Sequence, residues 1–259
     1  MRLRSVLAAF SLYSRIPMPH VSLNDDDSKY AITFLPLVGV VIGGIIYGVF
    51  ILCAYAKLPA FATAVILTVI PLAVTGGFHA DGFLDTKDAL GSYQPLDKKL
   101  EILKDPHVGS AAVTSFAAGI LIMAAGMCVI ANENKGVLAM ASVFVISRSL
   151  SALTSLCMKK AKPDGMLAST AGKKNAAMLV ILFIQLIIGC AAAAVDGAVF
   201  LITLTVVYVL YTLYYRHMVT SSFCGVTGDT AGYYVVGSEI AATAAIAVCA
   251  VAIRIIGGI

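Results

Sequence analysis

Three aspartates, Asp81, Asp85 and Asp88, lie within eight residues of one another in the stretch from Gly76 to Asp88. On a helix, at about 100° per residue, they lie within roughly 60° of one another and share one face. Like charges in this arrangement repel one another unless a cation lies between them. A divalent metal that also holds a phosphate would supply that cation, so the pattern predicts a metal site. The three residues alone leave a solvated acidic helix as the alternative.

A second polar block follows the aspartates. Residues Asp97 to Lys104 predict a short helix, which ends at Asp105 because a residue that precedes proline disfavours the helical conformation. Lys104 is a candidate phosphate contact, and Asp105 is a candidate further metal ligand. An amphipathic surface helix with a polar end is an equally good interpretation of this block.

Arg148 lies near the middle of an apolar run, in Ile146-Ser147-Arg148-Ser149. A charge at the centre of a membrane costs ~2.5–3.5 kcal/mol on insertion scales, so its side chain must face the interior of the bundle and find a partner. A carboxylate of the aspartate-rich segment or a substrate phosphate would serve. A structural salt bridge within the bundle is the alternative.

A glycine- and threonine-rich segment, Gly225 to Gly232, precedes the last apolar run and is followed by Glu239. Gly228 permits close approach of the backbone, and Asp229 is a candidate metal ligand. Thr227 and Thr230 offer hydroxyls to a phosphate or a metal. Asp229 could instead cap the start of the final helix.

The metal that these groups suit is Mg²⁺, because carboxylates are many and the histidines number only four. The six cysteines are far apart and form no Cys-x-x-Cys pair, which argues against a zinc site and a disulfide framework. The sequence contains no Walker-type loop and no recognisable Ser-His-Asp arrangement.

The elements that position these residues are membrane helices. The chain has 259 residues, 60% of them hydrophobic and 12% charged, with a mean hydropathy of +0.94, far from soluble composition. Seven apolar runs are close to the ~20 residues that cross a bilayer. They are Ile32–Tyr55, Leu58–Phe78, Ser110–Ala131, Gly136–Met158, Asn175–Val195, Gly197–Arg216 and Ser238–Gly257. The predicted fold is therefore an all-α polytopic membrane bundle of about seven transmembrane helices.

Two further segments complete this architecture. Arg2, Arg4 and Arg15 flank apolar positions at the N-terminus, which predicts an interfacial helix lying on the membrane. The aspartate-rich segment is expected to be a cytoplasmic or re-entrant helix. The longest polar stretches run to about 30 residues, so no separate soluble domain of ordinary size fits.

The positive charges predict the orientation of the bundle. With seven spans and a cytoplasmic N-terminus, fourteen of the Lys and Arg residues lie on one side and three, Lys57, Lys135 and Arg254, on the other. Cytoplasmic loops carry the excess of positive charge, so the aspartates are expected to face the cytoplasm. The net charge of +4 is modest and does not indicate a nucleic-acid partner.

The stretch from Gly76 to Asp88 resembles the signature of the cobalamin synthase family, the adenosylcobinamide-GDP ribazoletransferases. Further blocks resemble the same family and occur in the same order along nearly the whole chain. They are Phe10–Pro19, Thr33–Gly39, Leu100–Gly109, Ser147-Arg148 and Gly225–Gly232.

The resemblance implies a single integral-membrane catalytic domain, residues 1–259, in the plasma (inner) membrane of a prokaryote. Its members join adenosylcobinamide-GDP to α-ribazole or α-ribazole 5′-phosphate and release GMP. Adenosylcobalamin or its 5′-phosphate is the other product. The implied partners are these two substrates and membrane lipid, and the oligomeric state, including a homo-oligomer, is left open.

Site residues are carried over from the resemblance as expectations. Asp81, Asp85 and Asp88 would hold Mg²⁺ on the diphosphate, and Asp105 and Asp229 would complete the metal site. The remaining assignments concern the substrate. Lys104 and Arg148 would contact phosphate, Thr227 and Gly228 would line the binding site, and His79 would orient a ligand or act as a base toward the ribazole 5′-hydroxyl.

Three other classes remain as alternatives. A membrane prenyltransferase also uses Mg²⁺ on a diphosphate, but a second separated aspartate-rich motif is hard to find here. A CDP-alcohol phosphotransferase begins with Asp-Gly, as at Asp81-Gly82, yet the Ala-Arg expected shortly afterwards is absent from Phe83 to Thr86. A transporter would distribute its charges along several spans, whereas most charges here gather at one face.

Overall fold

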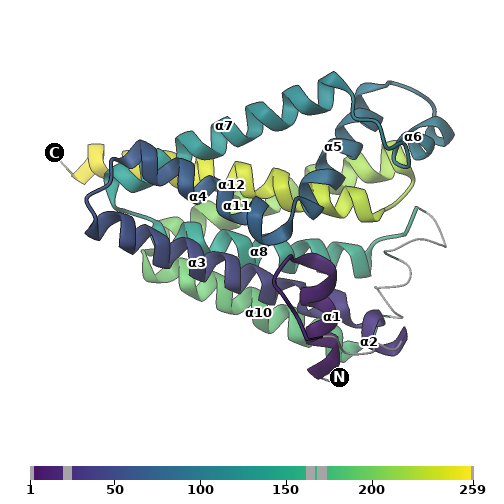
Figure 1. Ribbon diagram of the computed structural model, residues 1–259, viewed down its shortest axis with the longest axis horizontal. Helices are drawn as coiled ribbons and strands as arrows, with labels where there is room; N and C mark the ends of the chain where they lie inside the picture. The colour runs from purple at the N-terminus through teal and green to yellow at the C-terminus, as the bar shows by residue number, and fades with distance from the viewer. Residues whose placement is uncertain (1–2, 20–24, 162–166, 168–173, 258–259) are drawn as a thin grey trace.

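The computed structural model describes residues 3–19, 25–161, 167 and 174–257. In these ranges the chain forms helices and no β-strand, apart from one isolated bridge between Lys160 and Val226. The long helices run roughly along a common axis in Figure 1. Their bounds are α1 Leu3–Tyr13, α2 Asp25–Lys29, η1 Ala31–Phe34, α3 Leu35–Tyr55, α4 Ala60–Thr75, α5 Phe78–Gly91, α6 Leu96–Ile102, α7 Ser110–Glu133, α8 Val137–Cys157, α10 Ala176–Val195, α11 Ala198–Phe223 and α12 Gly228–Gly257.

Six helical segments of the described chain are long and apolar enough to cross a membrane: η1 with α3, then α7, α8, α10, α11 and α12. The second predicted span is α4, which is shorter than expected and forms a pair with α5 that is bent by 92°. Six spanning helices plus this broken pair confirm the prediction of an all-α bundle with about seven membrane segments. We treat α5 as lying outside the spanning segments.

Helix α8 forms the centre of the bundle and is buried along almost its whole length. It contacts α3, α10, α11 and α12, and Figure 1 shows it between them. The α3 backbone approaches it closely, since a Cβ added at Gly39 would lie 2.1 Å from the carbonyl oxygen of Phe144 and one at Gly43 would lie 2.4 Å from that of Ala141. Small residues at such crossings allow membrane helices to pack tightly.

The bend between α4 and α5 is produced by two adjacent glycines. Gly76 and Gly77 have φ angles of +60° and +81°, a left-handed conformation that other residues rarely adopt. Gly76 ends α4 in this conformation, with its amide bonded to the carbonyl of Leu72. The chain can therefore turn sharply, and α5 leaves α4 almost at a right angle.

The last helix begins earlier than the sequence predicted. The predicted final span starts at Ser238, whereas α12 starts at Gly228 and buries Tyr233 to Val236. The cause is local: the Thr227 hydroxyl accepts from the Thr230 amide at 3.1 Å, and the Thr230 hydroxyl accepts from the Thr227 amide at 2.9 Å. This reciprocal pair is a capping box, and it nucleates the helix ten residues upstream of the membrane run.

Candidate functional site

Helix α5 carries the three predicted aspartates and packs directly against the start of α12. The contact is between backbones, because a Cβ added at Gly82 would lie 2.7 Å from the carbonyl oxygen of Asp229. A Cβ added at Gly232 would likewise lie 3.1 Å from the carbonyl oxygen of His79. The two glycines let the helices approach closely, and so bring Asp229 beside the aspartates of α5.

Asp81, Asp85, Asp88 and Asp229 form what we call the carboxylate cluster. Burial, and then the neighbouring charges of Asp81, Asp229 and Asp88 in that order, raise the pKa of Asp85 to about 7. Asp81 is exposed and the other three are half-buried. The structure thus joins the triad to Asp229, which lies more than 140 residues later in the chain.

The chemistry of the cluster fits a hard divalent cation. Four carboxylates supply only oxygen donors, which Mg²⁺ prefers, and their mutual repulsion is what a cation would relieve. Among the described residues, however, no three His, Cys, Asp or Glu side chains converge closely enough to hold a metal as they stand. The donor set fits Mg²⁺, while the coordination geometry would need the side chains to draw together.

Asp88 also has a structural contact. Its Oδ2 accepts a hydrogen bond from the amide of Gly109, the residue that precedes α7. A Cβ at Gly109 would lie 2.4 Å from Asp88 Oδ1, so only glycine leaves room for this carboxylate. The bond fixes α5 to the start of α7 and leaves Asp88 fewer free lone pairs than Asp81 or Asp85.

Lys104 and Asp105 lie just beyond the end of α6, and both are exposed. Asp105 Oδ1 accepts from the His107 amide at 2.9 Å and contacts its ring Nδ1 at 2.7 Å. These hydrogen bonds, the backbone one first, lower the pKa of Asp105. The predicted helix and its end near Asp105 are confirmed, and the roles of Lys104 and Asp105 toward substrate and metal stay predictions.

Thr227 and Gly228 lie at the N-terminus of α12, next to the cluster. The Thr227 hydroxyl is engaged in the capping box with Thr230, so helix capping accounts for this residue type. A Cβ added at Gly228 would meet nothing within 4 Å, and no close contact of the protein itself requires glycine there. Asp229 lies in the first helical turn, where a negative charge is favoured by the helix dipole.

Arg148 is buried to 1% exposure and forms an ion pair with Glu239 of α12. Its Nη1 also donates to the carbonyl of Phe144 at 3.1 Å, and Ser147 Oγ donates to Glu239 Oε1 at 2.8 Å. Glu239 is thus the partner that the membrane-buried charge requires. The guanidinium faces the interior of the bundle, and its Nε is left without a hydrogen-bond partner.

His79 lies on the opposite side of α5 from Asp81, because two helical positions are about 200° apart. Its ring is buried between Tyr13 and Phe78, with centroid distances of 6.5 and 5.3 Å, and its Nδ1 has no partner. Burial, and then the charge of Arg148, lower the pKa of His79 well below its usual value. The ring shares a cavity of about 20 Å³, room for about one water, with Arg148 and Glu239.

The sequence did not predict that Arg15 lies beside the candidate site. It was interpreted only as part of an interfacial helix, yet it lines a pocket of about 580 Å³ that also includes Asp81. The signal was present in the Phe10–Pro19 block, where two prolines after Arg15 indicate a fixed, non-helical path.

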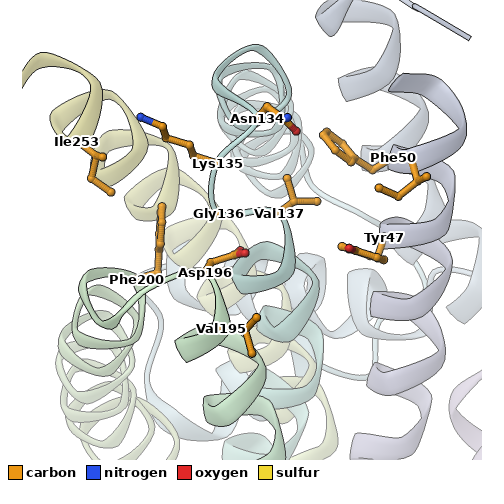
Figure 2. A pocket seen from close by; sticks show the side chains of 11 residues that line it. Tyr47, Phe50, Asn134, Lys135, Gly136, Val137, Val195, Asp196, Phe200 and Ile253 are labelled. Carbon is orange, nitrogen blue, oxygen red and sulfur yellow. The ribbon is translucent and has the colours of Figure 1, made fainter. Parts of the chain in front are cut away.

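A second pocket, of about 500 Å³, lies far from the carboxylate cluster, and Figure 2 shows its lining side chains. They come from the turns between α7 and α8 and between α10 and α11 and from the ends of α3 and α12. Asp196 lines it and accepts from the amide of Ala139 at 2.8 Å, which caps α8. None of the predicted site residues lines this pocket.

Comparisons with known proteins agree on one family. The family model described as "CobS: Cobalamin-5-phosphate synthase" matches residues 5–247. A protein of Lachnoclostridium phytofermentans named adenosylcobinamide-GDP ribazoletransferase is 33% identical over 249 residues, 95% of this chain and 94% of that protein. One of Brevibacillus brevis with the same name is 30% identical over 243 residues, 92% and 95% of the two chains. No solved structure matches significantly.

Proposed function

The chain belongs to the CobS family of transferases of cobalamin biosynthesis, and we propose that it joins adenosylcobinamide-GDP to α-ribazole or α-ribazole 5′-phosphate. The products would be GMP and adenosylcobalamin or its 5′-phosphate. The relatives are named for adenosylcobinamide-GDP, the donor substrate, and for ribazole, the group that is transferred. In this chain, the observation that supports the same function is the carboxylate cluster.

The reaction is a transfer at phosphorus. A hydroxyl oxygen of the ribazole bonds to the phosphorus nearest the cobinamide, and the bond from that phosphorus to the oxygen of GMP breaks. GMP leaves with the electron pair, and the hydroxyl proton passes to solvent. The chain must therefore bind a diphosphate, hold it in line with the hydroxyl and stabilise the charge that develops on the leaving phosphate.

The carboxylate cluster would bind the donor through Mg²⁺. When bound, Mg²⁺ would neutralise the diphosphate and stabilise the leaving GMP. Asp81 and Asp85 are the best placed ligands, since neither has a structural hydrogen bond that competes, as Asp88 has with Gly109. Asp229 reaches the same region from α12, which makes the α5–α12 contact the frame of the site.

Arg148 and His79 are assigned positioning roles in this proposal. Arg148 is engaged by Glu239 inside the bundle, and His79 faces the same cavity. The arrangement supports a role in which α5, α8 and α12 are held in one orientation, which fixes the position of Asp81 and Asp85 on α5. It favours the orienting role of His79 over that of a base, because its ring is buried.

The active face is proposed to be cytoplasmic. Most Lys and Arg residues were predicted to lie on one side of the membrane. Those that the structure describes, such as Arg15, Lys87 and Lys104, lie in or beside α1, α5 and α6, at the same end of the bundle as the carboxylate cluster in Figure 1. The three described cations of the other side, Lys57, Lys135 and Arg254, lie just after α3, just after α7 and near the end of α12. This distribution supports the insertion predicted by the positive-inside rule for a prokaryotic inner membrane.

The test is release of GMP by the purified protein in liposomes, given adenosylcobinamide-GDP and α-ribazole. We expect GMP and the joined corrinoid in equal amounts with Mg²⁺, and neither product with EDTA. Release without ribazole would indicate a hydrolase, and undiminished release with EDTA would remove the metal from the proposal.

A further inference from the structure

A pocket lies at the corner where α4 turns into α5, against the segment that follows α1. Ser11, Ser14 and Arg15 line it from the end of α1 and the segment after it, and Gly76 and Asp81 line it from the turn and from α5. We propose that this corner pocket receives the phosphates of the donor substrate, and that Arg15 is the side chain that contacts them. The proposal rests on the proposed transferase function. It adds a positively charged residue that binds phosphate, which the carboxylate cluster lacks.

The backbone of Arg15 is fixed in place. Its amide donates to the carbonyl of Val74, near the end of α4, at 2.8 Å. The hydroxyl of Ser14 donates to the carbonyl of Phe10 at 2.7 Å and accepts from the amide of Ile16 at 3.3 Å. The segment after α1 is thereby tied to the corner, so the side chain of Arg15 starts from a defined position.

The side chain of Arg15 lies across Gly76. A Cβ added at Gly76 would be 2.3 Å from Cγ of Arg15 and 2.5 Å from its Nε. Gly76 is therefore required twice: its φ of +60° turns the chain, and its lack of a side chain leaves room for the arginine. The adjacent Gly77 is required only for its positive φ angle, since a Cβ there would meet nothing within 4 Å.

The guanidinium of Arg15 has no ion pair or hydrogen bond within the described residues. Arg148 and Arg254, by contrast, pair with Glu239 and Glu133. Arg15 is also exposed, and it lines the same pocket as Asp81. An arginine held on a fixed backbone, with its donors free, is suited to bidentate contact with a phosphate.

The two charged side chains that line the pocket, Arg15 and Asp81, define the chemistry of the ligand. Arg15 favours an anion, whereas Asp81 and the rest of the carboxylate cluster repel one unless a cation intervenes. A diphosphate carrying a divalent metal suits both side chains, and uncharged α-ribazole suits neither. Arg15 would also meet the negative charge that grows on the departing GMP, which is the charge that most needs stabilising.

The experiment is steady-state kinetics in liposomes with Arg15→Ala, Arg15→Lys and the matched control Arg4→Ala. We expect Arg15→Ala to raise the KM for adenosylcobinamide-GDP and the inhibition constant of GMP by about tenfold to a hundredfold, the worth of one charged hydrogen-bonding group. The KM for α-ribazole should not change, and Arg15→Lys should recover part of the loss. Arg4 lies at the other end of α1, in its first turn, and does not line the pocket, so its replacement should have no effect.

A binding measurement gives a readout that does not depend on turnover. Fluorescent N-methylanthraniloyl-GDP with Mg²⁺ should bind the unaltered protein and Arg4→Ala, and bind Arg15→Ala at least tenfold more weakly. If Arg15→Ala does not run as a single folded species on size exclusion, Ser11→Trp fills the pocket from α1 and should weaken nucleotide binding in the same way.

Two results would overturn the inference: a KM shift on α-ribazole as large as that on the donor, or unchanged nucleotide binding in Arg15→Ala. Absence of GMP release from the unaltered protein would instead reject the proposed function. The two failures are therefore separable.

Discussion

The carboxylate cluster and the Arg148–Glu239 pair both place charges against the same helix, α12, yet the two regions differ in how those charges are balanced. At the pair, Glu239 accepts from Arg148 and Ser147, and a carbonyl of α8 accepts from Arg148. At the cluster, four carboxylates lie in one region, and the charges of the other three contribute to the raised pKa of Asp85. The opposite charges of the pair neutralise each other within the fold, whereas the like charges of the cluster leave a repulsion that a bound cation would relieve.

The largest effect is expected for activity at the cluster. Asp85→Asn should reduce GMP release by about a thousandfold, the scale of losing one group that stabilises a developing charge. The same change removes a repelled charge, so the thermal midpoint without Mg²⁺ should stay the same or rise. Asp97→Asn, in the first turn of α6, is the control and should have normal activity. Strong loss of folded protein in Asp85→Asn would mean that the cluster is structural.

The pair should show the opposite pattern, with stability affected most. Glu239→Ala leaves Arg148 buried and unpaired, which costs about 3–5 kcal/mol of unfolding free energy. Reversible denaturation in detergent micelles measures this difference. The double variant Arg148→Met with Glu239→Leu should recover most of the loss, because apolar replacements of a buried pair are often neutral. A Glu239→Ala protein as stable as the original would show that the ion pair has no such role.

The contact that joins the two regions is the crossing of α5 and α12. Gly82→Ala should force the helices apart at Asp229 and cost about 1–3 kcal/mol, with a fall in activity as Asp85 and Asp229 separate. Gly91→Ala, on the same helix, is the matched control, because its Cβ would lie at an ordinary 3.8 Å from Ala111. Equal losses in the two variants would argue against the close approach as the cause, since alanine has the higher helix propensity and should not itself destabilise α5.

The smallest effect concerns pH. Because the folded-state pKa of Asp85 is raised from 3.8 to about 7, the folded state binds a proton more tightly than the unfolded state. Without metal, stability should therefore be highest below pH 4 for this group and fall as pH rises toward 7. Asp85→Asn should remove this slope, and Mg²⁺ should oppose it. Thermal midpoints at several pH values check the direction, and an opposite slope would contradict it.

Much of this arrangement could be predicted from local sequence. The spacing of Asp81, Asp85 and Asp88 placed them on one helix face, and apolar runs located most spans. Hydrophobicity alone starts the final span at Ser238, whereas the local signal for the earlier start of α12 lies in the capping residues Thr227 and Thr230. The 92° bend has a local cause in Gly76 and Gly77, but two glycines do not specify a direction.

The contacts between distant segments were beyond such reasoning. Glu239 is 91 residues from Arg148, and neither its type nor its spacing identifies it as the partner. The position of Arg15 across Gly76 also depends on how α1 docks, which no local pattern encodes. These pairings arise from tertiary packing, where small residues such as Gly82 and Gly232 decide which helices meet.

Binding of Mn²⁺, a paramagnetic substitute for Mg²⁺, tests the central claim most directly. Electron paramagnetic resonance of the purified protein should show bound Mn²⁺ that Mg²⁺ displaces. Asp85→Asn and Asp81→Asn should lose this bound metal, and Asp97→Asn should retain it. Equal Mn²⁺ binding by all four proteins would contradict the assignment of the carboxylate cluster as the metal site.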